Sequence, residues 1–273
     1  MQTIVIPTDF SPEARNAALY AAELAKIFSA RLILFHAYML PTPVSEVPYV
    51  MITVDELQKE NEILLKKEVD HLSEAYSVQA EGIVRIGIPS DEIRALCEDL
   101  SVDLVVMGMK GAGGIDKMIG STTTNAIRKL KTPVLVIPTN RTFSPIRNIS
   151  YASDFSYAVT PSLFKPLVQL AKTFESKIHV INVHRQGEEL KTRQMEGKLA
   201  LENYFENVPH TFHDIPHQSI MHGITEYLKT NDSELLVMVE HKHSFFERLF
   251  SKDHTTAMAY ETKTPFLILQ DKS

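Results

Sequence analysis

The feature that most constrains this chain is that one unit is written twice in it. Four segments of the first half recur in the second half in the same order, with offsets of 145, 146, 131 and 132 residues. In the clearest pair, TIVIPTDFSPEA at 3–14 stands against NISYASDFSYAV at 148–159. A repeat of this kind indicates two copies of one folded unit, the second with a shortened middle. The other pairs are 24–38 with 170–184, 103–108 with 234–239, and 131–138 with 263–270.

The length fits two folded units. Domains usually contain about 100–200 residues, so 273 residues are comfortable for two. We expect the boundary in the segment TNRTFSPI at 139–146, which gives a first domain at 1–140 and a second at 146–273.

Each copy alternates short apolar runs with longer amphipathic segments. The runs are rich in Leu and β-branched residues and are bounded by turn residues, as buried strands are. Such alternation is typical of a parallel sheet covered by helices on both faces. We therefore expect two doubly wound five-stranded parallel-sheet α/β domains in tandem, with ligands bound beyond the carboxyl ends of the strands, where the winding reverses. In the first copy the expected strands are 3–7, 32–36, 80–86, 104–107 and 134–137, and the expected helices are 13–28, 55–75, 90–100 and one that starts after Ser121.

Composition narrows the functional class. Hydrophobic residues make up 44% and charged residues 23%, as in ordinary globular domains, and the apolar runs are too short to span a membrane. No amino-terminal secretion signal is recognisable, and the single cysteine, Cys97, suits a reducing compartment, so we expect a cytoplasmic protein without membrane contact. Residues 1–138 carry 13 basic against 18 acidic side chains, and the rest carry 15 against 16. Because neither half is basic, nucleic acid is not an expected partner.

Five of the ten glycines lie within the thirteen residues 108–120. This segment follows the fourth expected strand and ends where Ser121 opens a helix. Glycines let backbone N–H groups approach a ligand closely, and a helix N-terminus presents unpaired N–H donors to anions. The segment therefore predicts a phosphate-binding loop, although it matches neither the P-loop nor the dinucleotide-binding pattern. Considered alone, Ser121 could simply cap the helix.

The loop resembles the nucleotide loop of the universal stress protein family, written G-x-x-G-x9-G-[ST]. In this chain, at 108–121, eight residues stand between the second and third glycines of the pattern, one fewer than the family has. The resemblance covers essentially the whole chain, and the tandem arrangement is similar to that of the two-repeat members. The other matching segments are PTDFS at 7–11, R-x-G-x-P at 85–89, DLVVMG at 103–108 and TPVLVIP at 132–138.

The resemblance implies a Rossmann-like fold of the adenine nucleotide alpha hydrolase type. It also implies a site for ATP or another adenine nucleotide, with Mg²⁺ as its companion. The residues that it assigns to this site are Pro7, Thr8 and Asp9 at the floor, Ala37 beside the adenine, Met107, Gly108, Lys110 and Gly111 beside the ribose and phosphates, and Gly120, Ser121 and Thr122 at the phosphate tail.

Asp9 has more than one interpretation. Its carboxylate would repel a triphosphate unless it meets a ribose hydroxyl or a Mg²⁺ ion, which prefers oxygen ligands. It could also cap the first helix together with Ser11. The same residue type recurs as Asp154 in a copy without the glycine loop, which keeps the structural interpretation open.

The second copy does not keep the glycine loop. Its corresponding segment, 239–256, retains none of the five glycines and has Phe245 and Phe246 instead. We therefore expect at most one nucleotide per chain, and a second repeat that serves packing or partner binding. The last strands of the two copies lie at sheet edges, where open hydrogen-bonding groups favour pairing. They could pair with each other as an intrachain pseudo-dimer, and a homodimer is a further option.

Three weaker signals have simple structural explanations. Nine of the eleven histidines follow residue 138, but their spacing matches no established metal pattern, so surface histidines are favoured over a metal site. Cys97 lies four residues after Ile93 on an expected helix, as a core residue would. The segment 39–52 either covers the adenine side of the pocket or is an ordinary connection.

No activated nucleophile, paired carboxylates or metal triad converges on the glycine loop. The favoured interpretation is an ATP-binding universal stress protein, a stress-response regulator that holds its nucleotide in the first repeat. Two alternatives stay open. One is a slow ATPase or phosphotransferase that uses Lys110 and Asp9, and the other is an interaction protein whose shortened loop holds no nucleotide.

Overall fold

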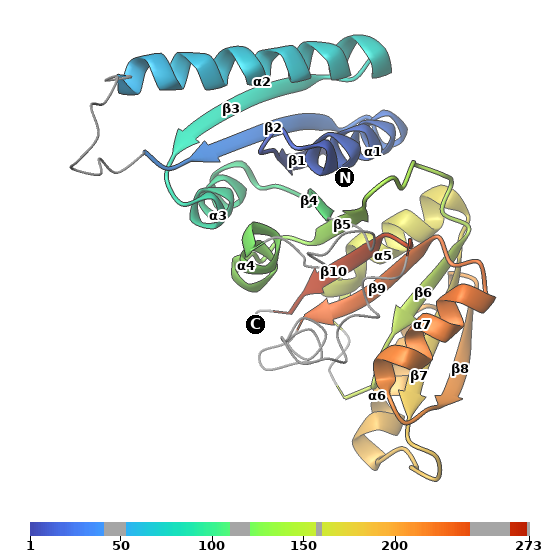
Figure 1. Ribbon diagram of the computed structural model, residues 1–273. Helices are drawn as coiled ribbons and strands as arrows, with labels where there is room; N and C mark the ends of the chain where they lie inside the picture. The colour runs from blue at the N-terminus through green and yellow to red at the C-terminus, as the bar shows by residue number, and fades with distance from the viewer. Residues whose placement is uncertain (41–52, 110–120, 157–159, 241–262, 272–273) are drawn as a thin grey trace. The chain divides into compact units, whose positions relative to one another are not determined.

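The chain folds as two compact units, each a layered α/β structure (Figure 1). The first unit comprises Met1–Gly108 and Gly120–Thr132, and the second comprises Met109–Ile119 and Pro133–Ser273. The computed structural model describes residues 1–40, 53–109, 121–156, 160–240 and 263–271.

The first unit contains a parallel sheet with the strand order β3-β2-β1-β4. The chain runs from β1 outward to β3 and then returns to the other side of β1, so the winding reverses between β1 and β4. Helices α1 and α2 pack together, as do α3 and α4 (Figure 1). The elements are β1 (Thr3–Pro7), α1 (Pro12–Phe28), β2 (Arg31–Tyr38), α2 (Val54–Tyr76), β3 (Ala80–Ile86), α3 (Pro89–Leu100), β4 (Leu104–Met109) and α4 (Ser121–Lys129).

Helix α1 shows why these residues form this element. Ser11 is its N-cap, with a side chain that accepts a hydrogen bond from the backbone N–H of Ala14, and Pro12 occupies the first helical position. The helix buries an alanine-rich face, which includes Ala17 and Ala21, each fully buried. Small side chains on this face let the helix lie close to the central strands, which are fully buried from Ile4 to Ile6.

The second unit repeats this architecture with the strand order β5-β10-β9-β6-β7-β8. Strands β6 to β9 and β10 pair in parallel, and the winding reverses between β6 and β9. The elements are β5 (Val134–Pro138), β6 (Asn148–Ala152), α5 (Pro161–Phe174), β7 (Lys177–His184), α6 (Thr192–Tyr204), β8 (His210–Pro216), α7 (Ile220–Thr230), β9 (Leu235–Glu240) and β10 (Phe266–Gln270).

Strand β5, the last strand of the first repeat, pairs antiparallel with β10, the last strand of the second. Leu135 lies opposite Leu267 and Val136 opposite Phe266. The structure therefore contains the pairing of terminal strands that the sequence left as one option. This pairing also explains why the compact units divide before β5, whereas the repeat in the sequence divides after it.

The expected strands and helices of the first copy are confirmed, with small differences at their ends. β2 continues to Tyr38 and β4 to Met109, each two residues beyond the expected range. Both extensions lie past the continuous apolar run, so the hydrophobic pattern did not reveal them. In β2 the extra residues still pair with β3, because Tyr38 lies opposite Ile86.

Candidate functional site

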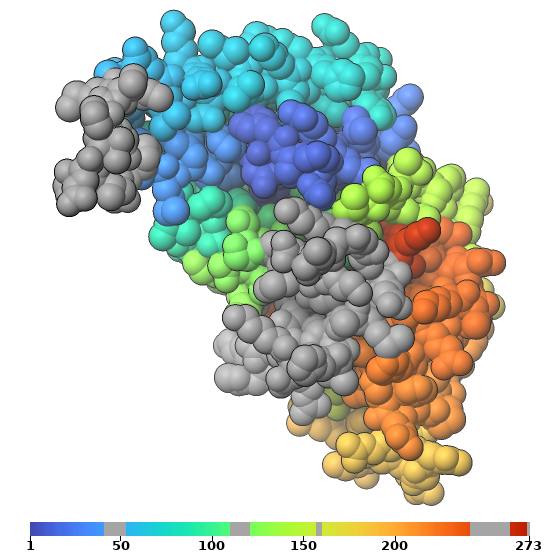
Figure 2. All heavy atoms as spheres, in the orientation of Figure 1, coloured from blue at the N-terminus to red at the C-terminus, as the bar shows by residue number. Residues whose placement is uncertain are grey.

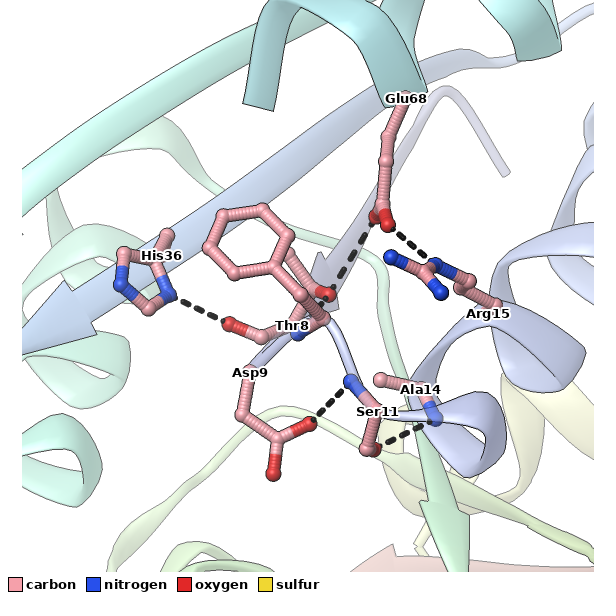
Figure 3. A network of polar contacts seen from close by, with 8 residues as sticks. Thr8, Asp9, Ser11, Ala14, Arg15, His36 and Glu68 are labelled. Carbon is pink, nitrogen blue, oxygen red and sulfur yellow. Dashed lines mark hydrogen bonds and ion pairs between the residues drawn. The ribbon is translucent and has the colours of Figure 1, made fainter. Parts of the chain in front are cut away.

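The turn after β1 lies at the edge of the sheet where the winding reverses, the place where doubly wound folds bind ligands (Figure 3). Phe10 has a left-handed backbone with φ of 62°, and its N–H donates to Thr8 Oγ1 at 3.0 Å. The N–H of Ser11 donates to Asp9 Oδ1 at 3.0 Å. Two side chains thus hold the turn, and the exposed Asp9 carboxylate keeps its second oxygen for other partners.

Asp9 does not cap the first helix. Ser11 makes the N-cap contact with Ala14, while Asp9 binds the backbone of Ser11 outside the helix. The capping interpretation of Asp9 is therefore wrong in its geometry, although the residue does stabilise the approach to the helix.

Three residues that the sequence did not single out support this turn (Figure 3). His36, at the end of β2, is 8% exposed and donates from Nδ1 to the carbonyl oxygen of Thr8 at 2.8 Å. Glu68 of α2 accepts from Thr8 Oγ1 at 3.5 Å and from Arg15 Nε at 2.7 Å. Glu68 lies 60 residues from Thr8, so no local motif could have revealed the contact. Helices α1 and α2, which carry Arg15 and Glu68, form much of the first unit's surface on the face that Figure 2 shows.

Gly108, at the end of β4, has a structural reason to be glycine. A Cβ at this position would collide with the carbonyl group of Glu13 in the first turn of α1. Its own carbonyl oxygen accepts from Thr123 Oγ1 at 3.5 Å, in the first turn of α4. The amino ends of two helices therefore meet at the end of one strand, which concentrates positive dipole potential there.

The structure brings together some of the residues assigned to the site. Pro7 ends β1, and Thr8 and Asp9 follow it. Met107 and Gly108 lie among the last three residues of β4, and Ser121 and Thr122 open α4. Met107 is 4% exposed, so little of its surface is open to a ligand. Ala37 is partly exposed one position before the end of β2. Lys110, Gly111 and Gly120 lie outside the described residues.

The second unit contains the same turn. The N–H of Phe155 donates to Ser153 Oγ at 3.1 Å, and the N–H of Ser156 donates to Asp154 Oδ1 at 3.0 Å. Phe155 is left-handed, with φ of 59°. Since this repeat lacks the glycines, the turn alone does not mark a ligand site.

The two repeats differ in the residue that faces the first helix. At an offset of 131 the counterpart of Gly108 is Val239, which carries the Cβ that Gly108 lacks. Helix α5 begins at Pro161, four positions later than α1 when the repeats are aligned at an offset of 145. In the second repeat a residue with a side chain therefore replaces the glycine that lets α1 approach β4 in the first.

The remaining candidates from the sequence are Cys97, the histidines of the second half and the segment 39–52. Cys97 is 7% exposed, and its burial raises the pKa of the thiol to about 11, which keeps it protonated and confirms the core assignment. Within the described parts of the chain, no group of three or more His, Cys, Asp or Glu side chains could hold a metal ion. His241 and His243 lie outside those parts, as does most of 39–52. No described helix is long and apolar enough to cross a membrane.

The model of the universal stress protein family matches residues 1–138. This chain belongs to the universal stress protein family. A universal stress protein of Methanocaldococcus jannaschii, MJ0531, is 31% identical over 142 residues, which are 49% of this chain and 80% of that protein. Curated relatives of this kind each match about half of the present chain, as expected for single-repeat proteins beside a tandem one.

Solved structures extend the similarity to both repeats. The crystal structure of a universal stress protein from Archaeoglobus fulgidus covers 98% of this chain and 98% of its own, with a TM-score of 0.75 and 17% identity. At that identity the likeness shows that the whole chain has the family's fold. A universal stress protein solved in complex with cAMP is 27% identical and covers 51% of this chain and 98% of its own, with a TM-score of 0.39.

Proposed function

We propose that this universal stress protein binds an adenine nucleotide, ATP in the first instance, in its first repeat. The site lies at the carboxyl ends of β1, β2 and β4 and includes the glycine-rich segment 110–120. The protein then acts as a regulator whose nucleotide state is read by partners. The observation that carries the proposal is the meeting of the α1 and α4 amino ends at Gly108, beside the exposed carboxylate of Asp9.

The chemistry of these residues suits a nucleotide. The first turn of α4, from Ser121 to Thr123, has backbone N–H groups without intrahelical partners, which can donate to phosphate oxygens. Asp9 would meet a ribose hydroxyl or a Mg²⁺ ion that neutralises the phosphates. Ala37 has a small side chain at the end of β2, so an adenine ring can approach the backbone there.

A regulatory role fits the same surroundings better than turnover does. Hydrolysis requires a group that orients or deprotonates water beside the phosphates. Among the described residues around the turn, the carboxylate of Glu68 is engaged with Arg15 and Thr8, and the buried Nδ1 of His36 donates to a backbone carbonyl. Asp9 is the one carboxylate of the turn with an open oxygen, and the proposal assigns it to binding.

The test is a thermal-shift titration of the full chain with ATP, with and without Mg²⁺, and then with cAMP. A ligand that binds only the folded state raises Tm, by at least about 5 °C at roughly 100-fold excess over Kd. Gly111→Val should abolish the shift, since a side chain there blocks close approach of the loop backbone. Asp9→Asn should reduce it, while Asp154→Asn serves as the matched control.

The control is matched because both aspartates accept the same turn hydrogen bond, which an asparagine oxygen can also accept. If the Tm shift persists without Mg²⁺ but weakens in Asp9→Asn, Asp9 is assigned to the ribose. If the shift is lost both when Mg²⁺ is left out and in Asp9→Asn, Asp9 is assigned to the metal. If neither nucleotide shifts Tm in the wild type and no nucleotide copurifies, the proposal fails. The chain would then work through its surfaces alone.

A further inference from the structure

The second unit contains a hollow of about 710 Å³ at the amino ends of β9 and β10. It is bounded by the last turns of α7, the turn at 231–234, and the residues just before β10. The Asp154 turn lies at the carboxyl ends of the strands of this unit, whereas the hollow lies at their amino ends. The hollow is therefore separate from the turn that both repeats share. Its volume falls within the range of small-molecule pockets, about 300–1,000 Å³.

Positive charge predominates in the lining. Arg141, Lys229 and Lys263 contribute three cationic side chains, against the two carboxylates of Asp232 and Glu234. Two of these side chains also have polar partners in the protein: Glu234 accepts from the backbone N–H of Asn148 at 2.6 Å, and Arg141 Nη2 donates to Ser144 Oγ at 3.1 Å. A phosphate or carboxylate group would therefore meet charge of opposite sign on several sides.

The helix end that borders the hollow is capped. The carboxyl end of a helix normally disfavours anions, because its last carbonyl groups point outward. In α7 the side chain of Asn231 donates to the carbonyl oxygen of Tyr227 at 2.9 Å, and Thr230 Oγ1 donates to that of Glu226 at 3.0 Å. These contacts give side-chain donors to two carbonyl groups near the helix end, which reduces the repulsion of an anion by those two groups.

A buried hydroxyl group at the wall supplies a second, independent indication. Thr225 is 2% exposed, and its Oγ1 has no hydrogen-bond partner within the described parts of the chain. A buried hydroxyl without a partner is costly, and a bound water, ion or ligand can satisfy it when the protein does not. Thr225 lines the hollow and has one O–H to donate.

The first repeat has different side chains at several of the positions that line this hollow. At an offset of 131, the counterparts of Thr225 and Lys229 are Arg94 and Glu98. These two form an ion pair of 3.3 Å across one helical turn of α3. The second repeat replaces the long Arg94 by a short threonine and the acid by a base, so one side chain is shorter and the pair gains a net positive charge.

We propose that this hollow binds a small anion that carries a phosphate or carboxylate group. Arg141, Lys229 and Lys263 supply the charge, and Thr225 Oγ1 donates the buried hydrogen bond. The degenerate repeat thereby has a ligand site of its own, independent of any nucleotide in the first repeat.

Isothermal titration calorimetry of the full chain tests the proposal with two probes, inorganic phosphate and succinate, at constant ionic strength. The chain carries Gly111→Val, which disables the glycine loop of the first repeat. Binding of either probe supports the shared anion chemistry, and the stronger one identifies the group. Lys263→Gln and Arg141→Gln should each weaken binding by about tenfold. Arg94→Gln, the matched change in the first repeat, should leave it unchanged.

Thr225→Val separates a binding role from a structural one. The change keeps the shape of the side chain and removes the hydroxyl, so Tm without ligand should stay the same or rise, while anion affinity falls by about fivefold. Amide resonances of Thr225, Leu228 and Ser233 should shift on titration. The proposal is overturned if neither probe binds at concentrations up to about 20 mM. It is also overturned if Arg94→Gln abolishes anion binding while Lys263→Gln leaves it unchanged.

Discussion

At the scale of single residues, the two repeats hold the same turn with different side chains. His36 donates from Nδ1 to the carbonyl oxygen of Thr8 at 2.8 Å, and Asn182 donates from Nδ2 to that of Ser153 at the same distance. Both donors are buried, and they occupy matching positions at an offset of 146. The turn thus requires a buried donor at this position, and the chain itself supplies two residue types that satisfy it.

This equivalence predicts an asymmetric response at His36. His36→Leu should lower the free energy of unfolding of the first unit by about 2 kcal/mol, because the Thr8 carbonyl loses its donor. His36→Asn should recover at least half of that loss, although it gives up the ring contact with Phe10, whose centroid lies 4.6 Å away. Urea unfolding followed by a first-unit probe measures both. Equal losses in the two variants would show that ring packing, not the donor, matters.

A pair of histidines in the second unit should make its stability depend on pH. His179 Nδ1 lies 3.3 Å from His213 Nε2, and Thr211 Oγ1 contacts both rings. Burial lowers the pKa of both histidines, and the positive charge of Lys177 lowers them further, while Asp214 acts in the opposite direction on His213. Their folded-state pKa values lie below the unfolded value of about 6.5. Stability is therefore complete above that pH and falls as the pH drops below it toward the folded values.

The corresponding positions in the first unit are apolar, which provides the test variants. His179 matches Ile33 at the offset of 146, and His213 matches Ile83 in the alignment of β8 with β3. The double change His179→Ile and His213→Ile should reduce the loss of Tm between pH 7.5 and 5.0 by roughly 2–5 °C. His71→Gln, an exposed histidine of α2, should not. If Tm of the double variant depends on pH as that of the wild type does, groups other than these two histidines cause the loss of stability in acid.

At the scale of elements, α6 is fixed to the turn after β6 by a close backbone approach. A Cβ on Gly197 would collide with the carbonyl oxygen of Phe155, and Gln194 Nε2 donates to the carbonyl oxygen of Asp154 at 2.8 Å. Replacing glycine by alanine within a helix normally stabilises it by about 1 kcal/mol. Here we expect the opposite sign: Gly197→Ala should lower Tm of the second unit, with a net cost of about 1–3 kcal/mol. Glu196→Ala, at an exposed neighbouring position, should have little effect.

The hydrophobic pattern predicted these elements well because each central strand is an unbroken apolar run. Ile4 to Ile6 and Leu104 to Val106 are fully buried, and the repeat showed that both halves share one architecture. The turn residues were predictable from the recurrence of Asp9 and Asp154. Contacts that depend on the rotation of a helix, such as Glu68 against Thr8, have no local signature.

Gly108 illustrates the other limit of sequence reasoning about the site. Its place in a glycine cluster favours a ligand contact, whereas the structure shows that the carbonyl group of Glu13 excludes a side chain there. A glycine required by packing and one required by a ligand look the same in a sequence. The distinction needs the three-dimensional position of α1, which sequence spacing does not provide.

At the scale of the whole molecule, β5 connects the two repeats through its pairing with β10. Val134 and Val136 of β5 are fully buried, as are Leu267 and Ile268 of β10. β5 belongs to the first repeat by sequence, yet it completes the sheet of the second unit. A second repeat without β5 would therefore expose both the apolar face and the open hydrogen-bonding edge of β10.

This arrangement predicts that the stable second fragment begins before β5. A fragment of 133–273 should have a Tm several degrees above that of 146–273, because burial of even three apolar strand residues contributes roughly 5 kcal/mol before entropic costs. Val136→Lys in the longer fragment should remove most of the gain, since it places a charge at a fully buried position. Equal Tm values for both fragments would mean that β10 does not need its antiparallel partner. The repeat boundary at 139–146 would then also be the folding boundary, and the pairing of the terminal strands would only join two independently stable halves.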